Sequence, residues 1–128
     1  MNRKEIQKLH MPWEKDYQYA QGVKRGGTVW LAGQLGHDDK GILAEGMEAQ
    51  VQLSYNNIKK LLTAFNLEMD DVVEEVLYVL DMPAAFEATK KLRQQFYKNP
   101  GEVATTIVAV SGLALPGQLI EIKIVAKQ

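Results

Sequence analysis

The chain has 128 residues, of which 46% are hydrophobic and 24% are charged, and its net charge at pH 7 is −1. This length favours a single domain over residues 1–128, and the apolar content argues against a disordered chain. A nearly neutral chain without a basic block is not expected to bind nucleic acid through charge. Because the sequence contains no cysteine, thiol catalysis, disulfides and cysteine-ligated zinc are excluded.

No segment predicts targeting or membrane insertion. The first residues, Met1-Asn-Arg-Lys-Glu, are polar and no apolar run follows them, so no signal peptide is predicted. No stretch is long and apolar enough to span a membrane. We therefore expect a cytoplasmic protein, and the lack of cysteine fits a reducing compartment.

The first forty residues alternate between short apolar runs and turn residues, as is typical of strands joined by tight turns. Pro12 argues against regular structure around it, and Gly26-Gly27 between two strand-like runs is typical of a hairpin. The predicted elements are an edge strand over residues 3–10, a loop over 11–16, strands over 17–24 and 28–32, and a polar turn over 37–41.

The middle of the chain predicts two helices separated by a strand. Between Gly46 and Asn66 the apolar residues recur at helical spacing. The β-branched run from Val72 to Leu80 predicts a strand, and Pro83 suits the first turn of a second helix, which ends at Asn99-Pro100-Gly101. The stripe of the first helix consists of Met47, Val51, Tyr55, Ile58, Leu61, Leu62 and Phe65.

Adjacent glutamates in the predicted strand, Glu74 and Glu75, must point to opposite faces. One of them is therefore expected to face the core or an interface. A carboxylate in such a place needs a partner.

The last quarter of the chain predicts two strands flanking a loop that contains Gly112, Pro116 and Gly117. In the second strand, alternation directs the isoleucines to one face and Glu121 with Lys123 to the other. The Glu121 face also carries apolar residues, so its carboxylate could act as a proton acceptor. A solvated pair of charges is the alternative interpretation. The isoleucines are Ile120, Ile122 and Ile124.

The order of these elements predicts an α+β fold, with one sheet and two helices packed on one face. The other face of the sheet would be exposed in a single copy. Val29, Leu31 and Leu119 indicate that this face is not strongly polar. We therefore expect the chain to form oligomers.

Several residue patterns resemble reactive sites, but their spacing does not fit one. His37, Asp38 and Asp39 are adjacent in a turn and would rarely converge on a metal, so no metal site is predicted. Gly33-Gln34-Leu35-Gly36 lacks the spacing of a phosphate-binding loop and favours tight backbone packing at a strand end. Ser111 followed by Gly112 lies between strands and lacks a histidine to activate it.

Two further groups of side chains have both a structural and a ligand-binding interpretation. The hydroxyls of Thr105 and Thr106 could contact a ligand, but both residues are also natural in strands. Trp13, Tyr17 and Tyr19 could line a pocket or cover an edge of the core.

An ordered set of segments resembles the Rid family of reactive intermediate (enamine or imine) deaminases, also called YjgF or endoribonuclease L-PSP. The resemblance extends from about Tyr17 to Ala126. It implies a chorismate-mutase-like α+β fold, a homotrimer and ligand clefts between subunits. The segments are Tyr19-Ala-Gln-Gly-Val23, Thr28-Val-Trp-Leu-Ala-Gly-Gln34, the helix over 46–65, and Leu119-Ile-Glu-Ile122.

The resemblance also implies a reaction and its residues. Water attacks the C=N carbon of an imine derived from an amino acid, which releases ammonia and a 2-keto acid. Glu121 and the main-chain carbonyl of Ile107 match the groups that position the water. Tyr19 matches a tyrosine that lines the cleft, and Gly33 matches a glycine after the second strand. No cofactor or metal is implied.

The sequence departs from the family pattern at the residue that grips the substrate carboxylate. Thr105 occupies the position of an arginine, which should weaken carboxylate binding by about 2–4 kcal/mol. Lys15, Lys24 and Arg25 are candidates to supply the missing charge. Ala32 stands where a serine is common and Lys90 where an asparagine is common, and the last loop is one residue longer, with Gly112 and Leu113 near a second basic position.

These considerations predict a hydrolytic deaminase with an altered small imine or enamine substrate, and as the alternative a non-catalytic trimer that binds a small metabolite. RNA cleavage, suggested by one family label, is disfavoured by the neutral charge and the lack of a basic stripe. The predicted catalytic groups are Glu121 and the carbonyl of Ile107, and the predicted substrate-binding residues are Tyr19, Ala32, Gly33, Lys90, Thr105 and Thr106.

Overall fold

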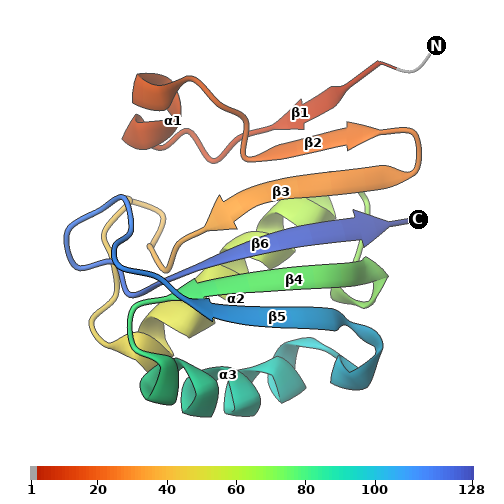
Figure 1. The fold of residues 1–128 in the computed structure, drawn as a ribbon. Coiled ribbons are helices and arrows are strands. Elements are labelled where there is room, and N and C mark those ends of the chain that lie inside the picture. Colours follow the sequence, from red (N-terminus) through yellow and green to blue (C-terminus); the bar gives the residue numbers. More distant parts are fainter. Residues whose placement is uncertain (1–2) are drawn as a thin grey trace.

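The computed structural model describes residues 3–128, which form one six-stranded sheet in the order β1-β2-β3-β6-β4-β5. Neighbouring strands are antiparallel except for β4 and β5, which are parallel. Figure 1 shows two helices, α2 and α3, on one face of the sheet and a short helix, α1, near one end of β1 and β2. The strands are β1 (Glu5–Gln7), β2 (Gly22–Arg25), β3 (Thr28–Gln34), β4 (Val72–Val79), β5 (Ala104–Ala109) and β6 (Ile120–Lys127).

The helices are α1 (Pro12–Tyr17), α2 (Met47–Ala64) and α3 (Met82–Phe96), with short 3-10 turns η1 (Met69–Asp71) and η2 (Pro100–Glu102). The predicted α+β fold, with its two main helices on one face, is confirmed. Among residues 3–128, no helix combines the length and the hydropathy needed to cross a lipid bilayer.

The core lies between the sheet and helices α2 and α3. The predicted isoleucine face of β6 is confirmed, because Ile120, Ile122 and Ile124 are all 0% exposed. Every residue of the predicted α2 stripe is buried as well. Burial of these large apolar side chains supplies the main driving force for the fold.

The prediction of a loop over residues 11–16 is wrong, because α1 occupies most of this segment. Pro12 stands in the first turn of the helix, where its missing N–H costs nothing and its fixed φ suits the helix. The buried carboxylate of Glu14 caps the helix by accepting a hydrogen bond of 2.8 Å from the backbone N–H of Met11. The strand predicted over 17–24 is correspondingly shorter and begins at Gly22.

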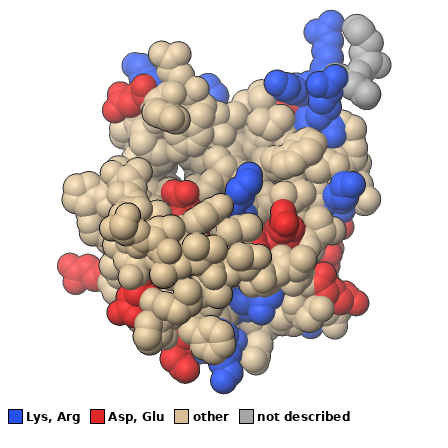
Figure 2. All heavy atoms as spheres, viewed as in Figure 1, with Lys and Arg blue, Asp and Glu red and all other residues tan. Residues whose placement is uncertain are grey.

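The open face of the sheet carries exposed apolar residues, but they are not the ones predicted. Val29 and Leu31 are 0% exposed and face the helices, so they contribute nothing to this surface. Trp30, which lies between them and points the other way, is 42% exposed, and Val108 on β5 is 38% exposed. In Figure 2 this side of the molecule carries only scattered charged side chains.

The segment Gly33-Gln34-Leu35-Gly36 packs tightly, as predicted. A Cβ on Gly36 would overlap the backbone of Gln50 on α2. The amide of Gln34 is buried and donates to Gln21 on the approach to β2, at 2.7 Å. The end of β3 is therefore fixed against both the sheet and α2, which positions Gly33 for the site described next.

Candidate active site

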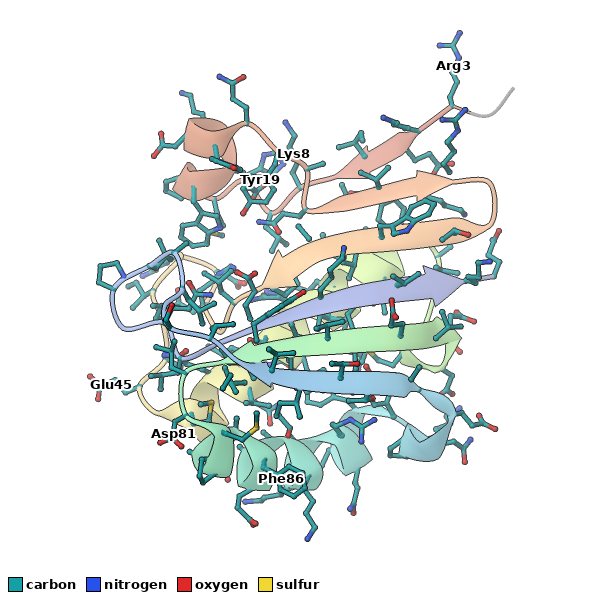
Figure 3. The ribbon with its side chains drawn as sticks, viewed as in Figure 1. Arg3, Lys8, Tyr19, Glu45, Asp81 and Phe86 are labelled. Carbon is teal, nitrogen blue, oxygen red and sulfur yellow. The ribbon has the colours of Figure 1, made fainter. Side chains whose placement is uncertain are left out.

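A cavity of about 430 Å³ lies where α1, the end of β3 and the loop before β6 meet. Figure 3 shows the labelled Tyr19 beside α1, directed toward the end of β3. Four of the predicted site residues line this one cavity: Tyr19, Ala32, Gly33 and Glu121. The remaining lining residues are Trp13, Tyr17, Leu35, Ala114 and Leu115.

Glu121 lies on the open face of β6 and is half-buried. Its carboxylate packs directly over Gly33, where a Cβ would overlap the carboxyl group. Gln118 donates a hydrogen bond of 3.4 Å to Oε1 of Glu121. Absence of a side chain at residue 33 thus creates the space in which this carboxylate sits.

Gly33→Ala is expected to move the Glu121 carboxylate out of its position, because the added methyl group and the carboxyl group cannot occupy the same space. A displacement on the order of 1 Å is enough to cost about a hundredfold in an enzymatic rate. For any reaction in which Glu121 takes part, we expect a large loss of kcat with little change in the melting temperature. An Ala substitution at Gly27, where the added Cβ would come no closer than 3.9 Å to another residue, is the matched control and should leave both quantities unchanged.

The cavity also holds a neutral hydrogen-bond donor. Burial and the nearby charge of Glu14 raise the pKa of Tyr19 to about 12, and Glu121 adds to this effect. The phenol therefore stays protonated at neutral pH. An acceptor carboxylate beside this donor suits a small polar ligand and an attacking water.

A second cavity, of about 450 Å³, lies between α3 and the edge strand β5. It contains the remaining predicted residues except one: Lys90, Thr105 and Ile107. Figure 3 shows Phe86, which also lines it, on α3. Thr106 is exposed and lines neither cavity.

Beneath the second cavity lies a buried carboxylate, Glu75, which is 0% exposed. The prediction that one of the two adjacent glutamates faces inward and needs a partner is confirmed. Glu75 accepts hydrogen bonds from four side chains, and each oxygen receives two. The donors are Tyr55 at 2.8 Å, Tyr97 at 2.9 Å, Thr105 at 2.9 Å and Nε of Arg93 at 2.6 Å.

The electrostatics of this cluster keep the two phenols neutral. Burial, followed by the negative charge of Glu75, raises the pKa of both Tyr55 and Tyr97. For Arg93, burial lowers the pKa, but the charge and hydrogen bond of Glu75 outweigh it and the pKa is raised. Arg93 therefore remains a cation and the tyrosines remain donors, so Glu75 is fully satisfied.

The two cavities lie on opposite faces of the sheet. Tyr78 on β4 pairs with Glu121, whereas its neighbour Leu77 pairs with Ile107. Because side chains alternate along a strand, Glu121 points to the open face and Ile107 to the helix face. Thr105, two residues before Ile107, also points to the helix face. Glu121 and Thr105 of one copy thus cannot contact the same small molecule.

Sequence reasoning missed Arg93, the cation that contacts Thr105. Nη2 of Arg93 donates to the Thr105 hydroxyl at 2.8 Å, whereas Lys15, Lys24 and Arg25 line neither cavity. One signal in the sequence pointed to such a cation: the inward-facing glutamate needs a positively charged partner. Which residue that partner is becomes clear only when α3 is packed on the sheet.

His37, in the polar turn, packs against neighbouring side chains and backbone. His37 is buried, contacts Trp13 edge-on at 5.0 Å between ring centroids, and its Nδ1 lies 2.8 Å from the carbonyl of Asp38. Within residues 3–128, no cluster of three metal-ligating side chains occurs.

Comparison with known proteins identifies the family. The family model described as Endoribonuclease L-PSP matches residues 13–128. The chain belongs to this family. The predicted resemblance to the Rid (YjgF) family is therefore confirmed.

Curated relatives match half of the chain or more. The RutC family protein SSO3206 of Saccharolobus solfataricus is 31% identical over 112 residues, which are 86% of this chain and 86% of the relative. The 2-iminobutanoate/2-iminopropanoate deaminase of Salmonella typhimurium is 37% identical over 65 residues, which are 50% of this chain and 51% of that protein.

Solved structures of other proteins share the fold. The crystal structure of RidA from the Antarctic bacterium Psychrobacter superimposes with a TM-score of 0.80 at 31% identity, covering 86% of this chain and 88% of that one. A YjgF/YER057c/UK114 family member from Mycobacterium tuberculosis gives a TM-score of 0.87 at 23% identity, over 98% and 100% of the two chains.

Proposed function

We propose that this protein is a hydrolytic deaminase of a small imine or enamine, with Glu121 as the group that orients and deprotonates the attacking water. The water oxygen bonds to the C=N carbon, and its proton passes through Glu121 to the nitrogen. The proton of the new hydroxyl group then passes through Glu121 to the amine, the C–N bond breaks as the C=O bond forms, and ammonia and a carbonyl compound are released. No external oxidant or reductant is needed.

The observation that carries this proposal is the placement of Glu121 in a concave site over Gly33, beside the protonated Tyr19. The deaminase names of relatives support the reaction class. A neutral phenol near the carboxylate supplies a hydrogen bond for the substrate without competing as a base.

We further propose that the working unit is a homotrimer in which the Glu121 cavity of one copy faces the Thr105 cavity of the next. Their positions on opposite faces of one sheet support this arrangement, because only two copies can bring both cavities to one ligand. The exposed apolar residues of the open face, such as Trp30 and Val108, support a protein partner there. A cytoplasmic location remains our expectation for such an enzyme.

The substrate is proposed to differ from that of arginine-containing family members. Thr105 offers a neutral hydroxyl, which already donates to Glu75 at 2.9 Å. It cannot form the charged bidentate contact that an arginine makes with a carboxylate. An altered position of the acid group, or a different small substrate, follows from this difference.

The alternative function is binding of a small metabolite without turnover. The presence of Thr105 at the arginine position favours it, since a protein without this charged contact to the substrate can lose catalysis and keep binding. In that case both cavities would still hold a ligand.

The experiment that tests the proposal measures ammonia release from freshly generated 2-iminobutanoate and from imines without a carboxylate. An arginine-containing family member serves as the positive control for 2-iminobutanoate, and sedimentation gives the number of chains in the assembly. We expect a rate well above the spontaneous one for at least one of these imines, and a mass of three chains. Spontaneous rates for all of them with an active control would contradict the deaminase, and a monomer would contradict the shared cleft.

A further inference from the structure

The cavity between α3 and β5 presents an arginine with unused donors. Arg93 donates from Nε to Glu75, and from Nη2 to the carbonyl of Pro100 at 3.2 Å and the hydroxyl of Thr105 at 2.8 Å. These contacts use the Nε hydrogen and both hydrogens of Nη2. Within residues 3–128, Nη1 makes no hydrogen bond, so two of the five guanidinium donors remain available to a ligand.

The guanidinium is held in place before any ligand arrives. The ion pair with the buried Glu75, at 2.6 Å, fixes its position. The guanidinium carbon also lies over the ring of Tyr97, 5.7 Å from its centroid. A planar donor group that is already ordered loses little conformational entropy when it binds an anion.

The cavity walls favour an anion with a small apolar part. Lys90 lines the cavity and forms no ion pair within the described residues. Among the residues that the structure describes, no carboxylate lines the cavity. Glu75 beneath it balances the charge of Arg93, which leaves Lys90 as a net positive charge. The apolar walls are Leu77, Phe86 and Ile107.

We propose that Nη1 of Arg93 binds the carboxylate of a small imino or oxo acid in this cavity, with Lys90 as the second cation. For the class of ligand, this inference rests on the proposed function. The acid group of the substrate would then lie against α3, displaced from strand β5, and the apolar walls would contact a short alkyl group.

The test is direct binding of 2-oxobutanoate by calorimetry, with the neutral 2-oxobutanamide as the matched ligand. We expect the natural protein to bind the acid more tightly than the amide. Arg93→Lys keeps a cation for Glu75 but lacks the fork, and should weaken binding of the acid by about tenfold or more. Lys90→Gln lies outside the Glu75 cluster and should weaken it by about threefold. Neither variant should change binding of the amide.

Lys91→Gln is the matched control. Lys91 is exposed on α3, outside the cavity, and pairs with Glu48 at 3.2 Å, so its substitution should leave binding unchanged. Equal affinity of the natural protein for acid and amide would overturn the inference, as would unchanged affinity for the acid in Lys90→Gln and a folded Arg93→Lys. If Arg93→Lys does not fold, Lys90→Gln alone decides.

The inference and the proposed function fail in different ways. Arg93-dependent binding of 2-oxobutanoate without release of 2-keto acid from imines would uphold the inference and contradict the deaminase. Imine turnover with a KM that is the same in the natural protein, Lys90→Gln and Arg93→Lys would uphold the deaminase and contradict the inference.

Discussion

Glu121→Gln is expected to lower kcat for imine hydrolysis by about a hundredfold to ten-thousandfold, the range that a positioned general base contributes. The amide has nearly the shape of the carboxylate, so it fits over Gly33 without enlarging the cavity. It cannot accept a proton from water at neutral pH. The loss should therefore appear in kcat, measured as 2-keto acid release, with the oligomeric state and melting temperature unchanged.

Glu48→Gln is the matched control for this change. Glu48 is an exposed glutamate in the first turn of α2 and pairs with Lys91 at the surface. Such pairs contribute little to stability, and this one lies outside both cavities. Its substitution should leave kcat unchanged. A Glu121→Gln variant as active as the natural protein would remove Glu121 from the mechanism.

Glu75→Ala is expected to lower the free energy of unfolding by about 3–5 kcal/mol, the cost of removing one partner of a buried ion pair. The substitution leaves the phenols of Tyr55 and Tyr97 without their shared acceptor. It also leaves the guanidinium of Arg93 without a counterion. Each of these unsatisfied groups adds a desolvation penalty. Urea or guanidinium unfolding, followed by circular dichroism, measures the effect.

Glu74→Ala, at the adjacent residue, is the control for that experiment. Glu74 is exposed, so the same substitution should change the free energy of unfolding by no more than about 0.5 kcal/mol. Because adjacent side chains of a strand point to opposite faces, the same substitution is expected to be strongly destabilising at Glu75 and nearly neutral at Glu74. If Glu75→Ala lowered the free energy of unfolding as little as Glu74→Ala does, Glu75 would not be a stabilising centre.

Local patterns predicted the parts of the fold that depend on one segment. The isoleucines of β6 and the stripe of α2 are periodic, and burial follows periodicity. Periodicity did not predict α1, because this helix is only six residues long, begins with a proline and buries little of its surface. There the deciding feature is the cap formed by Glu14, which depends on the fold of the preceding backbone.

From residue patterns alone, the candidate site was predictable only where one strand determines it, whereas Tyr19, Ala32 and Gly33 came from the family resemblance. Alternation along β6 assigned Glu121 to the face opposite the isoleucines, and the structure has it there. Arg93 was not predictable in the same way, because it meets Thr105 and Glu75 only after α3 packs on the sheet. These three residues belong to β4, α3 and β5, and no sequence pattern links them. The only indication is that a buried glutamate needs a cation.

The place of β6 in the sheet also bears on how the chain folds during synthesis. β6 is the last strand in chain order, yet it lies between β3 and β4. Until it is present, β1, β2 and β3 have no pairing with β4 and β5, and the core residues of α2 lack the strand that covers them. Folding therefore requires contacts between segments about ninety residues apart, such as Leu31 with Ile124. Such long loop closures slow folding, and the partly made sheet exposes strand edges that can pair with other chains.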